Sequence, residues 1–403
     1  MTAAAPPAAR GALALPEFVA LMAMLAATIA FSIDAMLPAL PAIGAELSPD
    51  DPNAAQLIIV AFVLGMGGGT LFAGPLSDRL GRKPVMLAGA ALYCAGAATA
   101  ALAPTLEGVL AARVLQGVGA AGPRVVSQAM IRDLYQGRGM ARVSSFVMTT
   151  FTLVPALAPL MGAGIIAVAG WRGVFWAFVV FSLISGAWLA LRQPETLAPA
   201  HRRPLRLRPL LAAAREVVSR RQTLLAVAAQ TMIFAILFST IVSSQGIYAE
   251  AFGRAESFPY WFGAVAVISG GAALTNAVLV ERLGMLYLLR RALAAHLGLS
   301  LVLALAFAPL PRDAAFALFL LWSVGSFGLA GLCIGNLNAI AMQPLGHVAG
   351  VASSLIAACA TIAGVLLAAP IGQALDGTPV PLAWGVALLT AAALLCAAAL
   401  REG

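Results

Sequence analysis

The sequence predicts an all-α protein that crosses a membrane many times. Hydrophobic residues make up 62% of the 403 residues, and only 10% are charged. The mean hydropathy is +0.96, and apolar runs of about 20 residues, the length of a membrane-spanning helix, recur along the whole chain. One water-soluble core cannot hide that much apolar surface, so the lipid bilayer is the expected solvent.

The apolar runs divide into twelve expected spans, arranged as two sets of six. The first set covers residues 17–41, 54–75, 84–103, 106–129, 142–166 and 172–192. The second set covers residues 222–246, 258–280, 286–308, 313–336, 348–373 and 380–400. A stretch rich in Pro and Arg separates the sets. We therefore expect an N-terminal bundle (1–192), a cytoplasmic linker (193–221) and a C-terminal bundle (222–403).

Basic residues in the short loops predict the orientation. If the N-terminus is cytoplasmic, most Lys and Arg residues lie on the inner side, and Arg172, Arg254 and Arg312 lie outside. Both termini are then cytoplasmic, and we expect no cleaved signal peptide. The net charge of +8 is explained by this topology signal, so no nucleic-acid partner is needed. The cysteines lie in apolar segments without metal-ligand spacing, so we expect no disulfide, metal or other cofactor.

A sequence repeat relates the two halves. LSDRLGRK at residues 76–83 recurs as LVERLGML at residues 279–286, at a constant offset of 203. A weaker similarity relates residues 144–162 to residues 353–372. Because each half has an even number of spans, both halves start and end on the same side of the membrane. The expected architecture is therefore two parallel six-helix repeats, related by an axis normal to the membrane.

Three motifs resemble those of a known family. GPLSDRLGRKPVM at residues 74–86 resembles the signature of the major facilitator superfamily between helices 2 and 3. LAARVLQGVGAA at residues 110–121 is similar to the helix 4 motif, and SIDAMLPALPAIGAEL at residues 32–47 to the helix 1 motif of twelve-span drug/proton antiporters. The chain is most similar to the Bcr/CflA-type multidrug exporters, the group that includes bicyclomycin and phenicol resistance exporters. The resemblance implies the major facilitator fold and a monomer in the bacterial inner membrane.

The loop between the second and third spans is interpreted as a conformational latch. Its fixed charges can pair in one arrangement of the halves and separate in the other, and its glycines permit a sharp backbone path. The alternative is a simple positive-inside anchor, which gives no reason for the acidic residue. The expected latch residues are Gly74, Asp78, Arg79, Gly81, Arg82, Lys83 and Arg132.

Asp34 and Arg113 are the candidate proton-coupling residues, because ionisable groups within membrane spans are costly and usually functional. A carboxylate with little water around it can hold a proton, and a neighbouring guanidinium favours its ionised form. The alternatives are a helix-end carboxylate in water for Asp34 and a purely structural ion pair for Arg113. Arg124, nearer the inner end of the fourth span, is expected to extend to the inner surface, with substrate binding as the alternative.

The resemblance implies that helices 1, 4, 7 and 10 line a central cavity. The candidate substrate-cavity residues are Asp34, Arg113, Gln116, Phe31, Met36, Phe234, Phe238 and Gln245, with Met148 and Phe151 as further apolar candidates. Helix packing is the alternative role for the apolar and amide members. The helix 5 motif of the antiporters is only partly kept: Pro159 and Gly162 match it, whereas Pro155 stands where a glycine is common.

These features predict proton-coupled efflux of small, largely apolar organic molecules or drugs by alternating access. The alternative is proton-coupled transport of a natural metabolite, such as a siderophore-like compound, an amino acid or a sugar. An enzyme is disfavoured, because no span carries a cluster of catalytic type.

Overall fold

The computed structural model describes residues 13–202 and 214–401, and this part of the chain is almost entirely helical. Helices in its N-terminal half are α1 (Leu15–Asp34), η1 (Leu37–Ala39), α2 (Leu40–Leu47), η2 (Pro52–Gln56), α3 (Leu57–Leu80), α4 (Arg82–Leu102), α5 (Leu106–Leu134) and α6 (Gly137–Arg192). After η3 (Pro199–His201) come α8 (Arg221–Glu250), α9 (Phe258–Leu283), α10 (Met285–Ala306), α11 (Arg312–Met342), η4 (Gln343–Val348), α12 (Ala349–Gln373) and α13 (Val380–Ala399). The predicted all-α membrane fold is confirmed.

Ten helices of the described chain are long and apolar enough to cross a membrane, and two details account for the difference from the twelve expected spans. α5 is less apolar than the others, since it carries Arg113 and Arg124 in its interior. α6 joins the fifth and sixth expected spans, with a break at Gly170. Gly170 has φ 66°, a left-handed backbone conformation that a residue without Cβ adopts most readily.

The first span also differs from its expected form of one helix over residues 17–41. α1 ends at Asp34, and the chain continues through the 3₁₀ turn η1 into the short helix α2. Pro38 and Pro41 explain the interruption, because proline lacks the N–H that would continue the helical hydrogen bonds. The carboxylate of Asp34 therefore lies at a helix end inside the protein.

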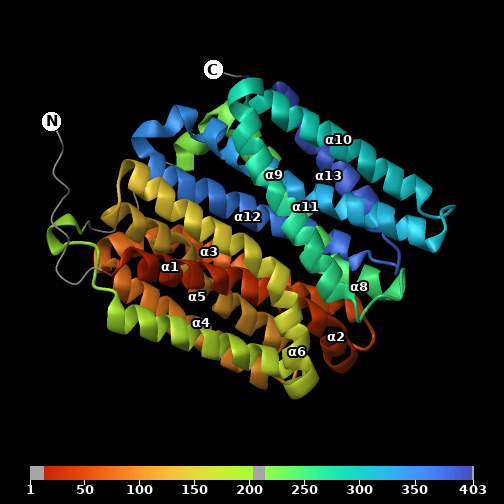
Figure 1. The fold of residues 1–403 in the computed structure, drawn as a ribbon, viewed down its shortest axis with the longest axis horizontal. Helices are drawn as coiled ribbons and strands as arrows, with labels where there is room; N and C mark the ends of the chain where they lie inside the picture. The colour runs from red at the N-terminus through yellow and green to blue at the C-terminus, as the bar shows by residue number, and fades with distance from the viewer. Residues whose placement is uncertain (1–12, 203–213, 402–403) are drawn as a thin grey trace.

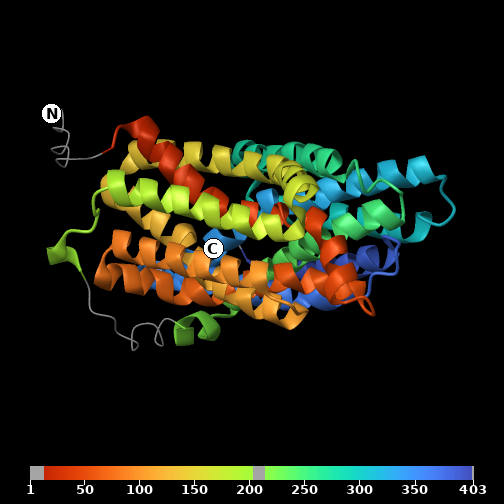
Figure 2. The same cartoon turned by 90° about the horizontal axis from the view of Figure 1, so that it is seen from below.

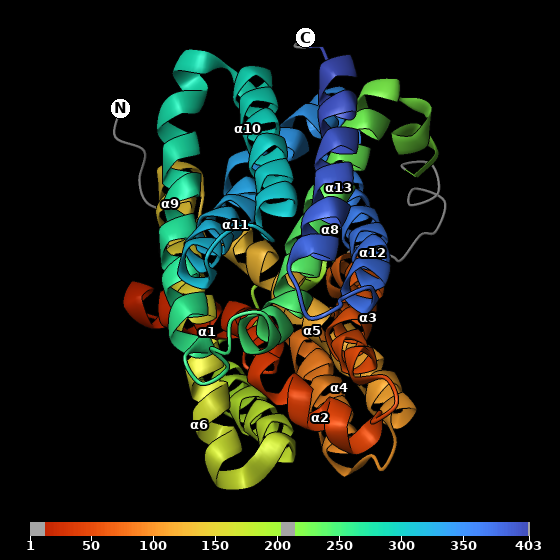
Figure 3. The same ribbon diagram turned by 90° about the vertical axis from the view of Figure 1, so that its right-hand side faces the viewer.

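The helices form two bundles that pack against each other (Figures 1 and 3). In Figure 3 the helices from α1 to α6 lie below those from α8 to α13. Helix α3 of one bundle packs along α12 of the other, and α6 packs along α9. Figure 2 shows that the start of α1 and the segment after α6 lie at one end of the molecule, whereas α2 lies at the opposite end. We call these the linker end and the far end.

Glycines allow very close packing around α5 in the N-terminal bundle. A Cβ atom on Gly119 would stand 2.5 Å from the backbone nitrogen of Tyr93, and one on Gly96 would stand 2.5 Å from that of Gln116. A Cβ on Gly117 would overlap the backbone of Phe62. The backbones of α3, α4 and α5 therefore touch, and this contact fixes the rotation of α5 and the direction of its arginines.

At the far end, hydrogen bonds join the two bundles. Asn53 Nδ2 donates to the carbonyl oxygen of Leu375 at 3.0 Å, and Gln373 Nε2 donates to the carbonyl oxygen of Asn53 at 2.8 Å. Asn53 belongs to η2, and Gln373 ends α12. The halves are thus held together at this end by uncharged groups.

Candidate functional site

Arg113 is completely buried in the N-terminal bundle. Its guanidinium donates to the carbonyl oxygen of Ile58 at 3.2 Å, to Oε1 of Gln116 at 2.7 Å and to the carbonyl oxygen of Ser32 at 3.0 Å. The ring of Phe62 lies 4.4 Å from the guanidinium carbon, close enough for a cation–π contact. Neutral acceptors and an aromatic face therefore surround this cation, and α1, α3 and α5 each contribute to its setting.

Asp34 is 4% exposed, and its carboxylate forms no hydrogen bond or ion pair with any described residue. The structure brings Arg113 to the backbone of Ser32, two residues before Asp34, without pairing the two charged side chains. Gly162 of α6 packs directly on the backbone of Ala35, where a Cβ would overlap the carbonyl oxygen. The retained glycine of the helix 5 motif thus allows α6 to approach the break in α1 beside Asp34. Pro155 and Pro159 lie inside α6, on the turns before this contact.

The other predicted cavity residues occupy different surroundings. Phe31 packs against Phe178 and Phe181 of α6, with ring centroids 5.2 and 5.3 Å away. Phe234 and Phe238 of α8 stack at 6.0 Å with their planes 15° apart. The remaining members Met36 and Gln245 are buried, and the side chains of Met148 and Phe151 lie outside those that the structure describes.

Sequence reasoning missed a hydroxyl pair beside Arg113. The hydroxyl oxygens of Ser32 and Tyr93 are 2.5 Å apart, and both side chains are buried. Ser32 Oγ also donates to the carbonyl oxygen of Thr28 at 2.6 Å, so Tyr93 is the donor to Ser32. The only available signal was a tyrosine in an otherwise apolar span.

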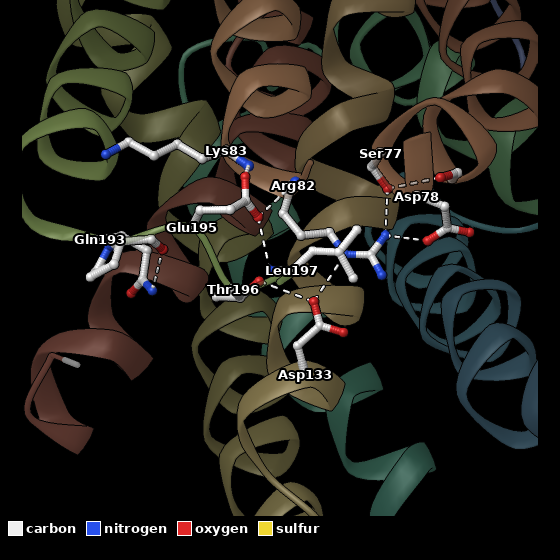
Figure 4. A network of polar contacts seen from close by, with 11 residues as sticks. Ser77, Asp78, Arg82, Lys83, Asp133, Gln193, Glu195, Thr196 and Leu197 are labelled. Atoms are coloured by element: carbon white, nitrogen blue, oxygen red, sulfur yellow. Dashed lines mark hydrogen bonds and ion pairs between the residues drawn. The ribbon is translucent and has the colours of Figure 1, made fainter. Parts of the chain in front are cut away.

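Arg82 is the centre of the polar network in the predicted latch loop (Figure 4). Its side chain is 8% exposed, and it donates to Asp78 at 2.5 Å and to Asp133 at 2.9 Å. It also donates to Ser77 Oγ at 2.7 Å. Asp133, at the end of α5, was not among the predicted latch residues, although its neighbour Arg132 was. The side chains of the predicted residues Arg79 and Arg132 are exposed. Gly74 lies between α5 and α12, where a Cβ would stand 3.6 Å from Val125 Cγ1 and 3.9 Å from Ser354 Oγ.

Glu195, three residues after the end of α6, caps the start of α4. Its carboxylate accepts hydrogen bonds from the backbone N–H groups of Arg82 at 2.9 Å and Lys83 at 3.0 Å. Lys83 Nζ in turn donates to the carbonyl oxygen of Ala190 at 2.6 Å. Gly81 has φ 107°, and a Cβ there would stand 2.6 Å from Glu195 Oε2. Glycine at this position therefore provides both the backbone conformation and the room for the cap.

Arg124 does not extend to the inner surface, so that expectation is wrong. It is half-buried, and its Nη2 donates to Thr361 Oγ1 of α12 at 3.4 Å. The close packing of α5 on α3 and α4 sets this direction, because it turns the helix face that carries Arg124 toward the other bundle. Within residues 13–202 and 214–401, no group of three or more His, Cys, Asp or Glu residues could hold a metal ion.

Two helical bundles with charged groups buried inside them, in a chain that crosses the membrane many times, define a polytopic membrane transporter. The model of the Major Facilitator Superfamily matches residues 20–368, and the chain belongs to this family. It is therefore a transporter and not an enzyme, and members of the family carry small molecules.

Individual relatives agree with this assignment. The chain is 28% identical over 375 residues to the bicyclomycin resistance protein homolog of Haemophilus influenzae, covering 91% of each chain. It is 37% identical over 172 residues to the multidrug resistance protein MdtL of Escherichia coli, covering 42% of this chain and 43% of that one. A crystal structure of a D-xylose-proton symporter has the same fold, with a TM-score of 0.79, 13% identity and coverage of 96% of this chain and 98% of that one.

Proposed function

We propose that this transporter exports small, largely apolar organic molecules or drugs in exchange for protons, by alternating access across the bacterial inner membrane. Both termini are on the cytoplasmic side, and the protein acts as a monomer. The printed names of the bicyclomycin and multidrug resistance relatives support the substrate class. The positive-inside distribution of arginines supports the orientation.

The observation that carries the proposal is the buried carboxylate of Asp34. A buried carboxylate without a partner is more stable when protonated, whereas contact with more water or a cation favours ionisation. Gly162 of α6 packs on the backbone of Ala35 at the end of α1, so a movement of α6 changes the surroundings of Asp34. Arg113 is a buried cation whose guanidinium donates to the carbonyl oxygen of Ser32, two residues before Asp34. Proton binding can therefore be coupled to the arrangement of the helices.

The loop around Arg82 is proposed as the latch of this cycle. Asp78 and Asp133 meet on one guanidinium that lies at the linker end, next to the surface where α3 faces α12. A change in the distance between the bundles alters the surroundings of Asp78, which is 45% exposed. In the proposal, this network stabilises the outward-facing arrangement.

The decisive experiment replaces Asp34 by Asn, which keeps the size of the side chain and removes its titration. A drug-sensitive bacterium that expresses the wild-type protein is expected to resist some members of a panel of drugs and metabolites. Asp34→Asn should abolish this resistance at unchanged expression. Asp50→Asn, an exposed carboxylate of the far end, is the matched control and should retain it.

Full efflux against a gradient by Asp34→Asn would contradict proton coupling through this residue. The metabolite alternative makes a different prediction. In that case the wild-type protein gives no drug resistance but changes the cellular level of one metabolite in the panel.

A further inference from the structure

Arg124 carries a positive charge into the contact between the two bundles without a matching negative charge. Thr361, which accepts its only hydrogen bond among the described residues, is fully buried in the middle of α12. None of the ion pairs of the described residues involves Arg124. A guanidinium has five N–H donors, and a cation at membrane depth is costly unless an anion or several acceptors surround it. Arg124 is only half-buried, so its unused donors are open to an anionic partner.

The register of α8 on α12 identifies the residues of α8 that lie at the level of Thr361. The Cβ position of Gly364 is 2.6 Å from Cβ of Phe234, and that of Gly372 is 3.0 Å from Val242. Gly372 follows Gly364 by eight residues on α12, and Val242 follows Phe234 by eight residues on α8. The two helices therefore run parallel. Thr361, one turn before Gly364, is consequently level with the turn of α8 before Phe234, which contains Gln230.

Gln230 presents an unsatisfied acceptor at this level. Its side chain is 3% exposed, and its Oε1 atom is buried without a hydrogen-bond partner among the described residues. Buried polar atoms without partners are uncommon in folded proteins, and each one needs an explanation such as an absent ligand. Phe234 and Phe238 lie one and two turns further along the same face of α8, where they form the stacked aromatic pair.

We propose that Arg124, Gln230 and Phe234 form a binding site for an aromatic carboxylate between the two bundles. The carboxylate pairs with the guanidinium of Arg124, a hydroxyl or amide N–H of the ligand donates to Gln230, and an aromatic ring packs on Phe234. The contact of Arg124 with Thr361 and the side chain of Gln230 lie at one level, and Phe234 lies one turn further along α8, so the polar groups of the ligand lie to one side of its ring. This inference rests on the proposed function and narrows its substrates to organic anions with an aromatic ring.

The test measures binding of hippurate, in which an aromatic ring, an amide N–H and a carboxylate follow one another in this order. Its methyl ester is the neutral control ligand. Calorimetric titration of the purified wild-type protein should show roughly tenfold or greater preference for hippurate, the range of a charge-assisted hydrogen-bonded pair. Arg124→Gln should abolish the preference, and Gln230→Met should weaken the binding of both ligands by a few fold.

Arg291→Gln is the matched control, since it removes an arginine from the surface of α10 and should leave the preference unchanged. Arg124→Lys keeps the charge and should retain part of the preference, which separates charge recognition from misfolding. Equal binding of acid and ester by the wild-type protein, absence of saturable binding, or an undiminished preference in Arg124→Gln would overturn the inference. Because binding needs no proton gradient, hippurate binding without any efflux would contradict only the proposed function.

Discussion

The two repeated loops share a backbone conformation but differ in their charges. Gly81 has φ 107° and ψ 158°, and Gly284 has φ 81° and ψ 155°. Each glycine ends one long helix and starts the next. Arg82 follows Gly81 and binds two carboxylates, whereas Met285 follows Gly284. Glu281 and Arg282 are exposed, and neither forms an ion pair within the described part of the chain.

This difference shows that the repeat preserves the turn, while the polar network depends on residues outside it. Asp133 comes from the end of α5, and Glu195 follows α6. Neither belongs to the repeated segment. The network can therefore act in the N-terminal half alone. Substitutions at equivalent positions of the two loops should have unequal effects on stability and conformation.

The largest expected difference is between Arg82→Ala and Met285→Ala. Loss of Arg82 leaves Asp78 and Asp133 close together without their shared cation, so we expect a stability loss of about 2–4 kcal/mol. Met285→Ala removes only partly buried apolar surface and should cost about 1 kcal/mol or less. Thermal unfolding of the two variants in the same detergent measures the difference. Equal Tm values for both variants would mean that the charged network adds no stability.

The glycines provide the next comparison. Gly81→Ala and Gly284→Ala both force a side chain into a backbone region that is nearly exclusive to glycine, at a cost of about 1–3 kcal/mol each. Gly81→Ala should cost more, because its Cβ would also press on Glu195. Thermal unfolding should show that adding Glu195→Ala removes this excess. If the excess remains in the double variant, the contact with Glu195 is not its cause.

Asp78→Asn tests the latch itself. Because Asp78 is 45% exposed, its pairing with Arg82 is worth about 1 kcal/mol, and its loss should shift the population toward the inward-facing arrangement by about fivefold. The measurement is labelling of single cysteines at the two mouths, after replacement of Cys94, Cys333, Cys359 and Cys396. Glu281→Gln is the control and should cause no shift. Identical labelling of Asp78→Asn and wild type would leave this loop as an anchor alone.

The smallest expected effect is that of Glu195→Gln. The amide keeps one acceptor oxygen for the backbone N–H groups at the start of α4 but loses the negative charge that favours this helix end. We expect a loss of about 0.5–1 kcal/mol, to be measured as a decrease in Tm. Glu281→Gln should stay within about 0.5 kcal/mol of wild type. A larger effect at Glu281 would show that the second loop has a stabilising role of its own.

The amino-acid sequence determined the all-α membrane class, the repeated loop and the family. Apolar length and glycine placement are local properties, and the bilayer converts them directly into helices and turns. The hydrogen bond between Arg113 and Gln116 agrees with their spacing of about one helical turn. Even the weakly apolar helix α5 was predicted, as the expected span over residues 106–129.

Only the tertiary structure decided which side chains meet. Arg82 pairs with Asp133, which is 51 residues away, and Arg124 reaches Thr361, which is 237 residues away. These contacts depend on the rotation of each helix about its axis, which is set by the close approach of the backbones at the glycines around α5. Sequence periodicity places residues on one face of a helix, but the packing of its neighbours decides where that face points.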